Sequence, residues 1–134
     1  MRLFTWAVAV VVLLLIAAGC PGPHFHGSDL LQMRAAKSIA LAIDDYYADT
    51  SNYPDALTDV KSYFGAEGGW PVNPYDGKPI ADTGSPDFDP ATSVGMVYYQ
   101  KLYRDEMLIN YQLHVFGAKG KLYIIGNTAA GLKE

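Results

Sequence analysis

The sequence contains a single cysteine, so no disulfide can form within the chain and a zinc site built from several thiolates is not expected. It has only three histidines, and it lacks an excess of basic residues, since the formal net charge is −4 over 134 residues. That balance offers no basic surface for nucleic acid. Half of the residues are hydrophobic and 18% are charged, which is typical of one small packed domain.

The N-terminal segment lacks charge from residue 3 to residue 19, and the first acidic residue of the chain is Asp29. Arg2 precedes this apolar run, and the small residues 17–19 end it just before Cys20. A basic start, an apolar centre and small residues at the end are typical of a secretory signal. A membrane-spanning helix, which needs about 20 apolar residues, is the alternative.

The stretch Ala17-Ala18-Gly19-Cys20 resembles the end of a bacterial lipoprotein signal. The resemblance implies cleavage before Cys20, acylation of its thiol with chains such as palmitate, and anchoring at about 0.8 kcal/mol per buried CH₂. An uncleaved helix and plain secretion remain alternatives, and all three place the domain outside the cytoplasm. Pro21 is not the aspartate associated with inner-membrane retention, so we favour the outer membrane or the cell surface.

The remainder divides into a lipid-anchored tether (20–28), a domain (29–126) and a frayed tail (127–134). Apolar residues recur every three to four positions in 29–49, which predicts a long amphipathic helix with Ser28 or Asp29 as its N-cap. A second, shorter helix is expected over 55–64. The polar stretch 80–93 is expected to be a surface loop.

Three strands are predicted after these loops, over 95–103, 107–116 and 121–126. Within the second, alternate residues are apolar, which predicts a face of Ile109, Tyr111, Leu113 and Val115. Short turns between neighbouring strands indicate an antiparallel meander. The fold class is therefore α+β: a long N-terminal helix packed on a three-stranded antiparallel sheet, with a short second helix and a Pro-rich loop between. We expect Ile39 and Ile43 to cover the sheet.

This order resembles the globular part of type IV pilin-like proteins, above all the major pseudopilin of type II secretion. The resemblance lies in the helix end at 40–50 with Asn52-Tyr53-Pro54, and in the loop Trp70-Pro71-Val72-Asn73-Pro74-Tyr75-Asp76-Gly77-Lys78-Pro79. It implies a pilin-like fold and a structural or adhesive role. The resemblance also implies that the protein is an accessory to a secretion or pilus machine and that its partners are components of that machine.

Two departures from the family pattern shape the expectation for assembly and metal binding. Pilins begin, after cleavage, with a phenylalanine, carry a glutamate at the fifth position, and continue into an apolar spine, whereas Pro21-Gly22-Pro23 follows Cys20 here. We therefore expect a monomer or weak dimer rather than a filament. The family's calcium site near the last hairpin is not carried over, because the only acid in residues 107–134 is Glu134.

No pattern of nucleophile, base and acid predicts catalysis, so neither an enzyme nor a cofactor is expected. We interpret His24 and His26 as solvated tether residues and His114 as solvent-facing. The acids of the 82–89 loop are interpreted as solvated, although calcium there remains open. The Pro-rich loop is the candidate interaction site, through Trp70, Asn73, Tyr75, Asp76 and Lys78.

Two other functions remain open from the sequence. One is a membrane-tethered module that binds a small ligand through the strand tyrosines or the 70–90 loop. Seventeen aromatic residues, ten of them tyrosine, make such a surface plausible, because alternation along strands turns some of them outward. The other is a minor pilin whose N-terminal helix stays uncleaved.

Overall fold

The computed structural model describes residues 27–65 and 69–126, and its long helix α2 (Gly27–Thr50) confirms the predicted helix over 29–49. Its buried face carries Ala36, Ile39 and Ile43, at the spacing of one helical stripe. The helix stops at Thr50 because Ser51 adopts a positive φ of 58°, and the Thr50 hydroxyl donates back to a carbonyl of the last turn at 2.8 Å.

The sheet has three antiparallel strands in the order β1-β2-β3, namely β1 (Val97–Arg104), β2 (Met107–Phe116) and β3 (Lys121–Ile125). Asp105 and Glu106 form the two-residue turn between β1 and β2, with φ of 48° and 67°. Two consecutive positive φ angles give the turn whose twist suits a tight hairpin. The meander and the α+β class are therefore confirmed, with each strand within two residues of its predicted bounds.

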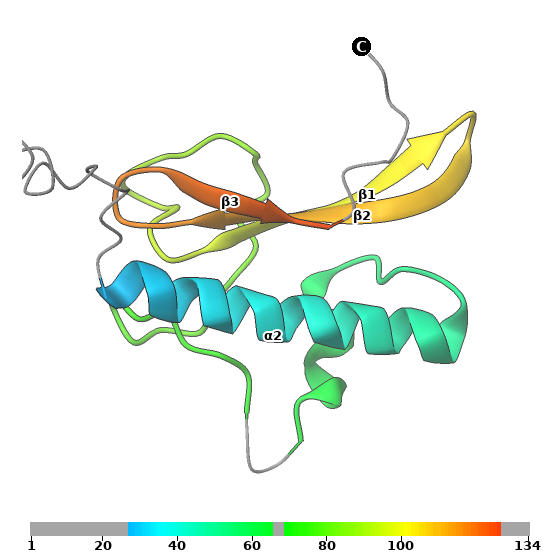
Figure 1. The fold of residues 1–134 in the computed structure, drawn as a ribbon, viewed down its shortest axis with the longest axis horizontal. Helices are drawn as coiled ribbons and strands as arrows, with labels where there is room; N and C mark the ends of the chain where they lie inside the picture. The colour runs from blue at the N-terminus through cyan, green and yellow to red at the C-terminus, as the bar shows by residue number, and fades with distance from the viewer. Residues whose placement is uncertain (1–26, 66–68, 127–134) are drawn as a thin grey trace, which may run out of the picture.

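The helix packs along one face of this sheet (Figure 1). Residues of that face alternate along the strands and are fully buried or nearly so: Val97, Tyr99, Tyr111, Leu113 and Val115. Ile39 and Ile43 are both 0% exposed beneath them. The predicted helix–sheet core is confirmed, except that Ile109 lies toward the hairpin and is only half-buried.

Part of the opposite face of the sheet is covered by the segment 80–93, which was predicted as a surface loop and is exposed along most of its length. Ile80 and Ser93 are buried at the two ends of that segment, and the Phe88 ring lies 6.0 Å from the ring of Phe116. Phe116 is 0% exposed and His114 is 6% exposed. The expectation that His114 faces solvent is wrong, because its imidazole is buried and packs against the Tyr98 ring, with centroids 5.3 Å apart.

The second helix is shorter than predicted and is a 3₁₀ helix, η1 (Leu57–Tyr63), rather than an α-helix over 55–64. Leu57 and Val60, three residues apart, are its buried side chains, as the three-residue turn requires. The Asp59 carboxylate accepts hydrogen bonds from the backbone N–H groups of Asp55 and Ala56 at 3.1 and 3.0 Å. Those bonds satisfy donors that a helix start leaves free.

Candidate functional site

The Pro-rich loop predicted as an interaction site begins on a fixed aromatic side chain. The Trp70 indole N–H donates to the carbonyl of Ile80 at 2.7 Å, which ties the start of the loop to its end. The ring packs edge-on against Phe64, with centroids 5.1 Å apart, and the Lys61 ammonium lies 5.3 Å from its centroid. Trp70 is therefore half-buried support for the loop.

Asn73 fixes the middle of the loop from inside the protein. It is 1% exposed, its amide donates to the carbonyl of Val94 at 2.8 Å, and its side-chain oxygen accepts the N–H of Tyr75 at 2.9 Å. Gly95 lies directly against it, and a Cβ built on Gly95 would stand 1.9 Å from the Asn73 side-chain oxygen. Both polar groups of Asn73 are thus used within the chain.

Tyr75 joins the loop to the beginning of α2. Its hydroxyl donates to the carboxylate of Asp29, a residue 46 positions earlier that is 7% exposed. The N–H of Ala118, in the β2–β3 turn, approaches the same carboxylate oxygen at 3.4 Å. Burial and the neighbouring carboxylate raise the pKa of Tyr75 above its usual value. Asp29 was predicted as an N-cap and instead lies within the first turn, where it links the loop, α2 and the sheet.

The tip of the loop is left to solvent by these contacts. Val72 is 55% exposed, and Asp76 and Lys78 form a loose ion pair at 3.9 Å. Beside the tip lies a groove of about 490 Å³ whose other wall is formed by Ala91, Thr92, Val94 and Met96. Of the five predicted interaction residues, Asp76 and Lys78 are exposed, whereas Trp70 and Asn73 hold the loop in place. Tyr75 holds the loop through its hydroxyl and also lines the groove.

The acids of the 82–89 loop mostly serve its local turns. Asp82 accepts the N–H of Gly84 at 2.8 Å, and Asp89 accepts the N–H of Ala91 at 2.9 Å. Such bonds from an aspartate to the backbone two residues on are typical of turns. Within 27–65 and 69–126, no three acidic, histidine or cysteine side chains are grouped so that they could hold a metal ion.

A line of polar side chains runs across the far face of the sheet and ends at His114. The Tyr98 hydroxyl donates to Gln100 at 3.2 Å, and Gln100 donates to Gln112 at 3.0 Å. The imidazole Nε2 of His114 lies 3.4 Å from the Gln112 oxygen, and its Nδ1 is buried without a hydrogen-bond partner. Burial, together with the charge of Lys121, lowers the pKa of His114.

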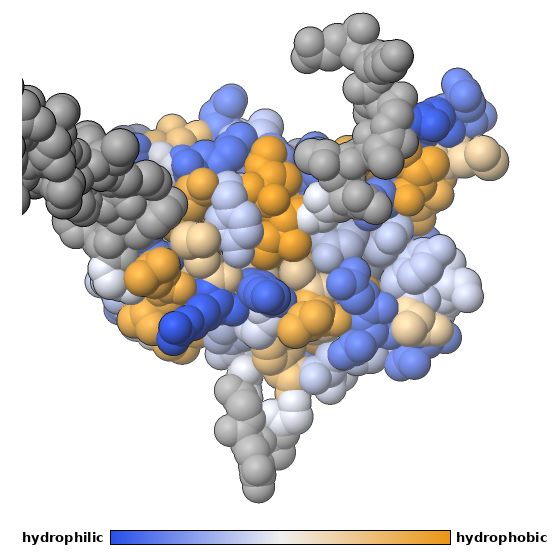
Figure 2. Space-filling model, viewed as in Figure 1, coloured by the Kyte–Doolittle hydropathy of each residue, from blue (hydrophilic) through white to orange (hydrophobic). Residues whose placement is uncertain are grey.

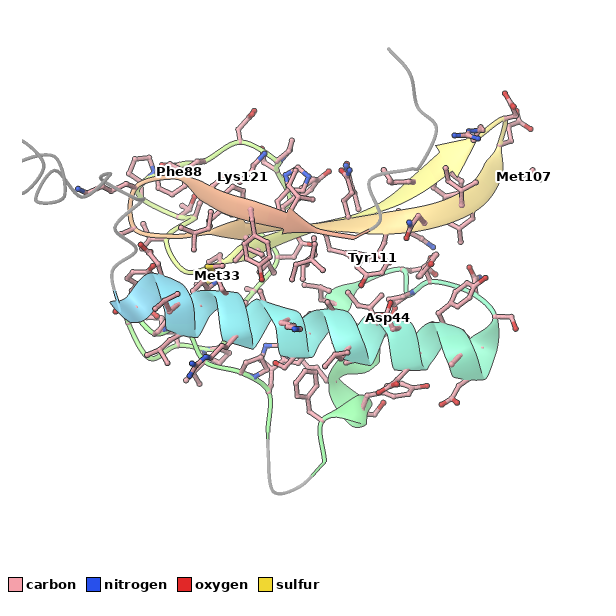
Figure 3. The ribbon with its side chains drawn as sticks, in the orientation of Figure 1. Met33, Asp44, Phe88, Met107, Tyr111 and Lys121 are labelled. Carbon is pink, nitrogen blue, oxygen red and sulfur yellow. The ribbon has the colours of Figure 1, made fainter. Side chains whose placement is uncertain are left out.

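A tyrosine cluster gathers where the end of α2 meets the Tyr-Pro turn and β2. The Tyr111 hydroxyl donates to the Asp44 carboxylate at 3.2 Å, and these two side chains point toward each other from β2 and α2 (Figure 3). The Tyr53 ring stacks on Tyr47 at 4.4 Å and lies 5.2 Å from Tyr111. Burial raises the pKa of Asp44, an effect that the Tyr111 hydrogen bond opposes. Sequence reasoning missed this cluster, because Tyr111 and Asp44 are 67 positions apart in the sequence.

A second groove, of about 590 Å³, separates α2 from the edge strand β3. Leu30, Met33, Arg34 and Lys37 form its helix wall, and residues 123–126 form the other. Apolar and charged side chains alternate over this part of the molecule (Figure 2). Three leucines of α2 are among the exposed apolar residues, namely Leu30, Leu31 and Leu41.

The predicted lipidation site Cys20 and the tether histidines His24 and His26 lie outside the described residues, as do the apolar run before them and the tail 127–134. Among the helices of the described part, none combines the length and the hydropathy needed to span a membrane.

Comparisons with known proteins give no relative for this chain. No protein-family model matches it. No significant match is found among curated proteins or among solved structures. The pilin-like resemblance therefore stays a prediction from the sequence.

Proposed function

We propose that this chain is a lipid-anchored, extracytoplasmic interaction protein with a pilin-like domain, and an accessory to a secretion or pilus machine. The observation that carries the proposal is the Pro-rich loop, held from both sides and open at its tip. Loops on rigid scaffolds are favoured recognition elements, because little entropy is lost when an already ordered segment binds. Val72, Asp76 and Lys78 form the tip that would meet the partner.

The pilin-like part of the proposal rests on element order and on two sequence features at their expected places. The Tyr53-Pro54 turn follows the end of α2, and the Tyr99 hydroxyl donates to the carbonyl of Pro54 at 2.7 Å. The loop 70–79 then returns to the start of α2 through Tyr75 before the meander begins. The anchor rests on the lipoprotein-like stretch that ends at Cys20.

The anchor is tested by the intact mass of the full chain extracted from membranes of the cells that make it. A chain beginning at Cys20 with acyl mass added is expected, and Cys20→Ser, the control, should leave the signal uncleaved and the acyl mass absent. A wild-type chain that retains Arg2 would replace the lipid anchor with the uncleaved helix of a minor pilin.

The partner is tested by placing a photo-crosslinking residue at Val72 in the full chain. The matched control is Met107, which is 67% exposed at the β1–β2 hairpin, far from the loop (Figure 3). We expect adducts at 72 that mass spectrometry identifies as components of a secretion or pilus machine. Equal labelling from both positions would show that the loop recognises nothing.

The groove of about 490 Å³ favours a second candidate, a membrane-tethered module that binds a small molecule. Its volume lies in the range of ligand pockets, and Tyr75, Asp76 and Lys78 bring an aromatic ring and both signs of charge to one wall. Native mass spectrometry of the chain purified from its own cells distinguishes this candidate. A bound small molecule that Lys78→Ala releases, with no crosslinked protein at 72, would support it.

A further inference from the structure

The outer face of α2 carries a stripe of exposed residues that nothing in the described part of the chain covers. Along the exposed flank of α2, from the groove beside β3 toward the end of the helix, lie Leu30, Arg34, Lys37, Leu41, Asp44 and Asp45, which we call the outer stripe. At 3.6 residues per turn these six positions fall within an arc of about 100°. Leu30 is 47% exposed and Leu41 is 57% exposed.

Charge is segregated along the outer stripe. Both bases, Arg34 and Lys37, lie in the N-terminal half of α2, and both acids, Asp44 and Asp45, lie in the C-terminal half. Neither base forms an ion pair with any residue of 27–65 or 69–126. Leu41 lies between the two pairs, so the stripe is an apolar residue flanked by opposite charges.

The last turn of α2 departs from the usual electrostatics of a helix. A helix favours acids near its N-terminus and bases near its C-terminus, whereas the last turn of α2 contains no base and Asp49 lies in it. Burial raises the pKa of Asp44, and the neighbouring carboxylate of Asp45 adds to that shift. Asp44 and Asp49 each accept a hydrogen bond from a tyrosine of the same chain. Arg34, Lys37 and Asp45 form no ion pair within 27–65 and 69–126, so their charges remain available to a partner.

From the charge order and the exposed leucines of the outer stripe, we infer that two copies of this chain pair through α2, antiparallel and related by a twofold axis close to residue 40. At 1.5 Å per residue, that axis places Arg34 within about 1.5 Å, along the helix, of the level of the second copy's Asp45. Lys37 likewise lies within about 1.5 Å, along the helix, of the level of the second copy's Asp44. The two Leu41 side chains then pack together beside the axis.

The pairing is isologous, so each contact occurs twice and both copies use the same surface. Asp44 can take part because the Tyr111 hydroxyl occupies only one of its two oxygens. A single pair of helices is a small interface by the standards of stable complexes, so the dimer is expected to depend on concentration. The inference does not rest on the proposed function, because it needs neither the Pro-rich loop nor the lipid.

Disulfide crosslinking of the full chain in the cells that make it tests the geometry. With an axis near residue 40 and helix axes about 8–10 Å apart, two cysteines at position 41 can meet. Leu30→Cys is the matched control, because antiparallel copies hold the two positions 30 about 30 Å apart along the helix. We expect a disulfide dimer for Leu41→Cys, above the background of the wild type with Cys20, and none for Leu30→Cys.

Crosslinks at both positions would indicate parallel helices and overturn the inference, as would a crosslink at neither. A dimer formed instead through the edge strand β3 would leave position 41 uncrosslinked and would be captured by Ile124→Cys. That side chain is 39% exposed on the edge strand.

Charge reversal tests the recognition, with the full chain in detergent and sedimentation as the measurement. Arg34→Glu leaves Lys37 as the only base of the outer stripe. Asp45→Arg leaves Asp44 as its only acid. Each should weaken self-association at least ten-fold, or ~1.4 kcal/mol. An equimolar mixture of the two should associate more tightly than either alone, and the double variant should regain wild-type association.

The reversed positions are exposed, so circular dichroism should show unchanged secondary structure in all these variants. Single variants that associate like the wild type would overturn the inference, and so would a double variant that fails to recover while keeping its fold. A wild-type chain that remains monomeric up to ~1 mM would overturn it as well.

Discussion

Gly95→Ala is the substitution that best tests how the Pro-rich loop is held. Gly95 has a φ of +70°, and a Cβ there would stand 1.9 Å from the side-chain oxygen of Asn73. Asn73 cannot yield freely, because its two polar groups bond to Val94 and Tyr75. Gly77 offers a matched control, since its φ is +72° but a Cβ there would meet nothing within 4 Å.

The magnitude follows from two separate costs. An alanine at positive φ costs about 1–2 kcal/mol, and this cost applies to both glycines. Displacing Asn73 adds about 1–3 kcal/mol for each buried polar group that loses its partner. We therefore expect Gly77→Ala to lower the free energy of unfolding by about 1–2 kcal/mol and Gly95→Ala to lower it by at least about 3 kcal/mol.

Thermal unfolding measures the difference. For a domain of about 100 residues, 1 kcal/mol corresponds to about 4–8 °C in Tm, so Gly95→Ala should melt at least about 8 °C below Gly77→Ala. Asn73→Ala supplies the decisive control. In the Asn73→Ala variant, adding Gly95→Ala should lower the free energy of unfolding only by the cost of the backbone strain. The Asn73 side chain is then no longer present to clash with the new Cβ. Equal Tm values for the two glycine variants would refute this account of the loop.

Three further expectations concern the core, the far face and assembly. Ile43→Ala should cost about 2–5 kcal/mol in unfolding by urea, whereas Leu31→Ala, which is exposed on the same helix, should change stability by about 0.5 kcal/mol or less. The lowered pKa of His114 means that the unfolded chain binds the proton more tightly. Stability should therefore fall as pH drops below about 6.5, and His114→Gln should flatten the dependence of Tm on pH between 7.5 and 5.5. Residues 21–134 should sediment at micromolar concentration without long polymers, and polymers would return the protein to the filament-forming class.

The secondary structure could be predicted because its signals are local. The three-to-four spacing of Ala36, Ile39 and Ile43 identifies a helix and its buried face within one segment. The alternation of Leu113 and Val115 with polar neighbours identifies a strand in the same way. The short turn Asp105-Glu106 then leaves an antiparallel pair as the only geometry available.

The cover on the far face could not be predicted by the same reasoning. Alternation shows that His114 and Phe116 share a face, but it does not show whether another segment covers that face. The covering loop is rich in aspartate, proline and serine, and between Ile80 and Ser93 its only large apolar side chain is Phe88. A single aromatic residue in a polar stretch was too weak a signal to assign it to a core.

The candidate site depends on contacts between distant residues, which sequence patterns do not report. Asn73 was expected on the interaction surface, yet it is buried because the chain returns at Val94, 21 positions later. Tyr75 meets Asp29 across 46 positions. The sequence indicated which segment is constrained, through its prolines, while only the fold distinguishes the residues that support the loop from those that its tip presents.

The charge order of α2 bears on assembly as a whole. Copies of α2 that ran parallel and in register would set Arg34 beside Arg34 and Asp45 beside Asp45, and like charges at contact distance repel. Antiparallel copies place each base beside an acid of the other copy. A twofold contact is complete once two chains have paired, whereas a filament needs a contact that repeats in one direction. The outer stripe thus favours a closed pair and opposes a parallel bundle. Since the segment after Cys20 also lacks an apolar spine, both features lead to the same expectation, that the chain forms monomers or pairs rather than a filament.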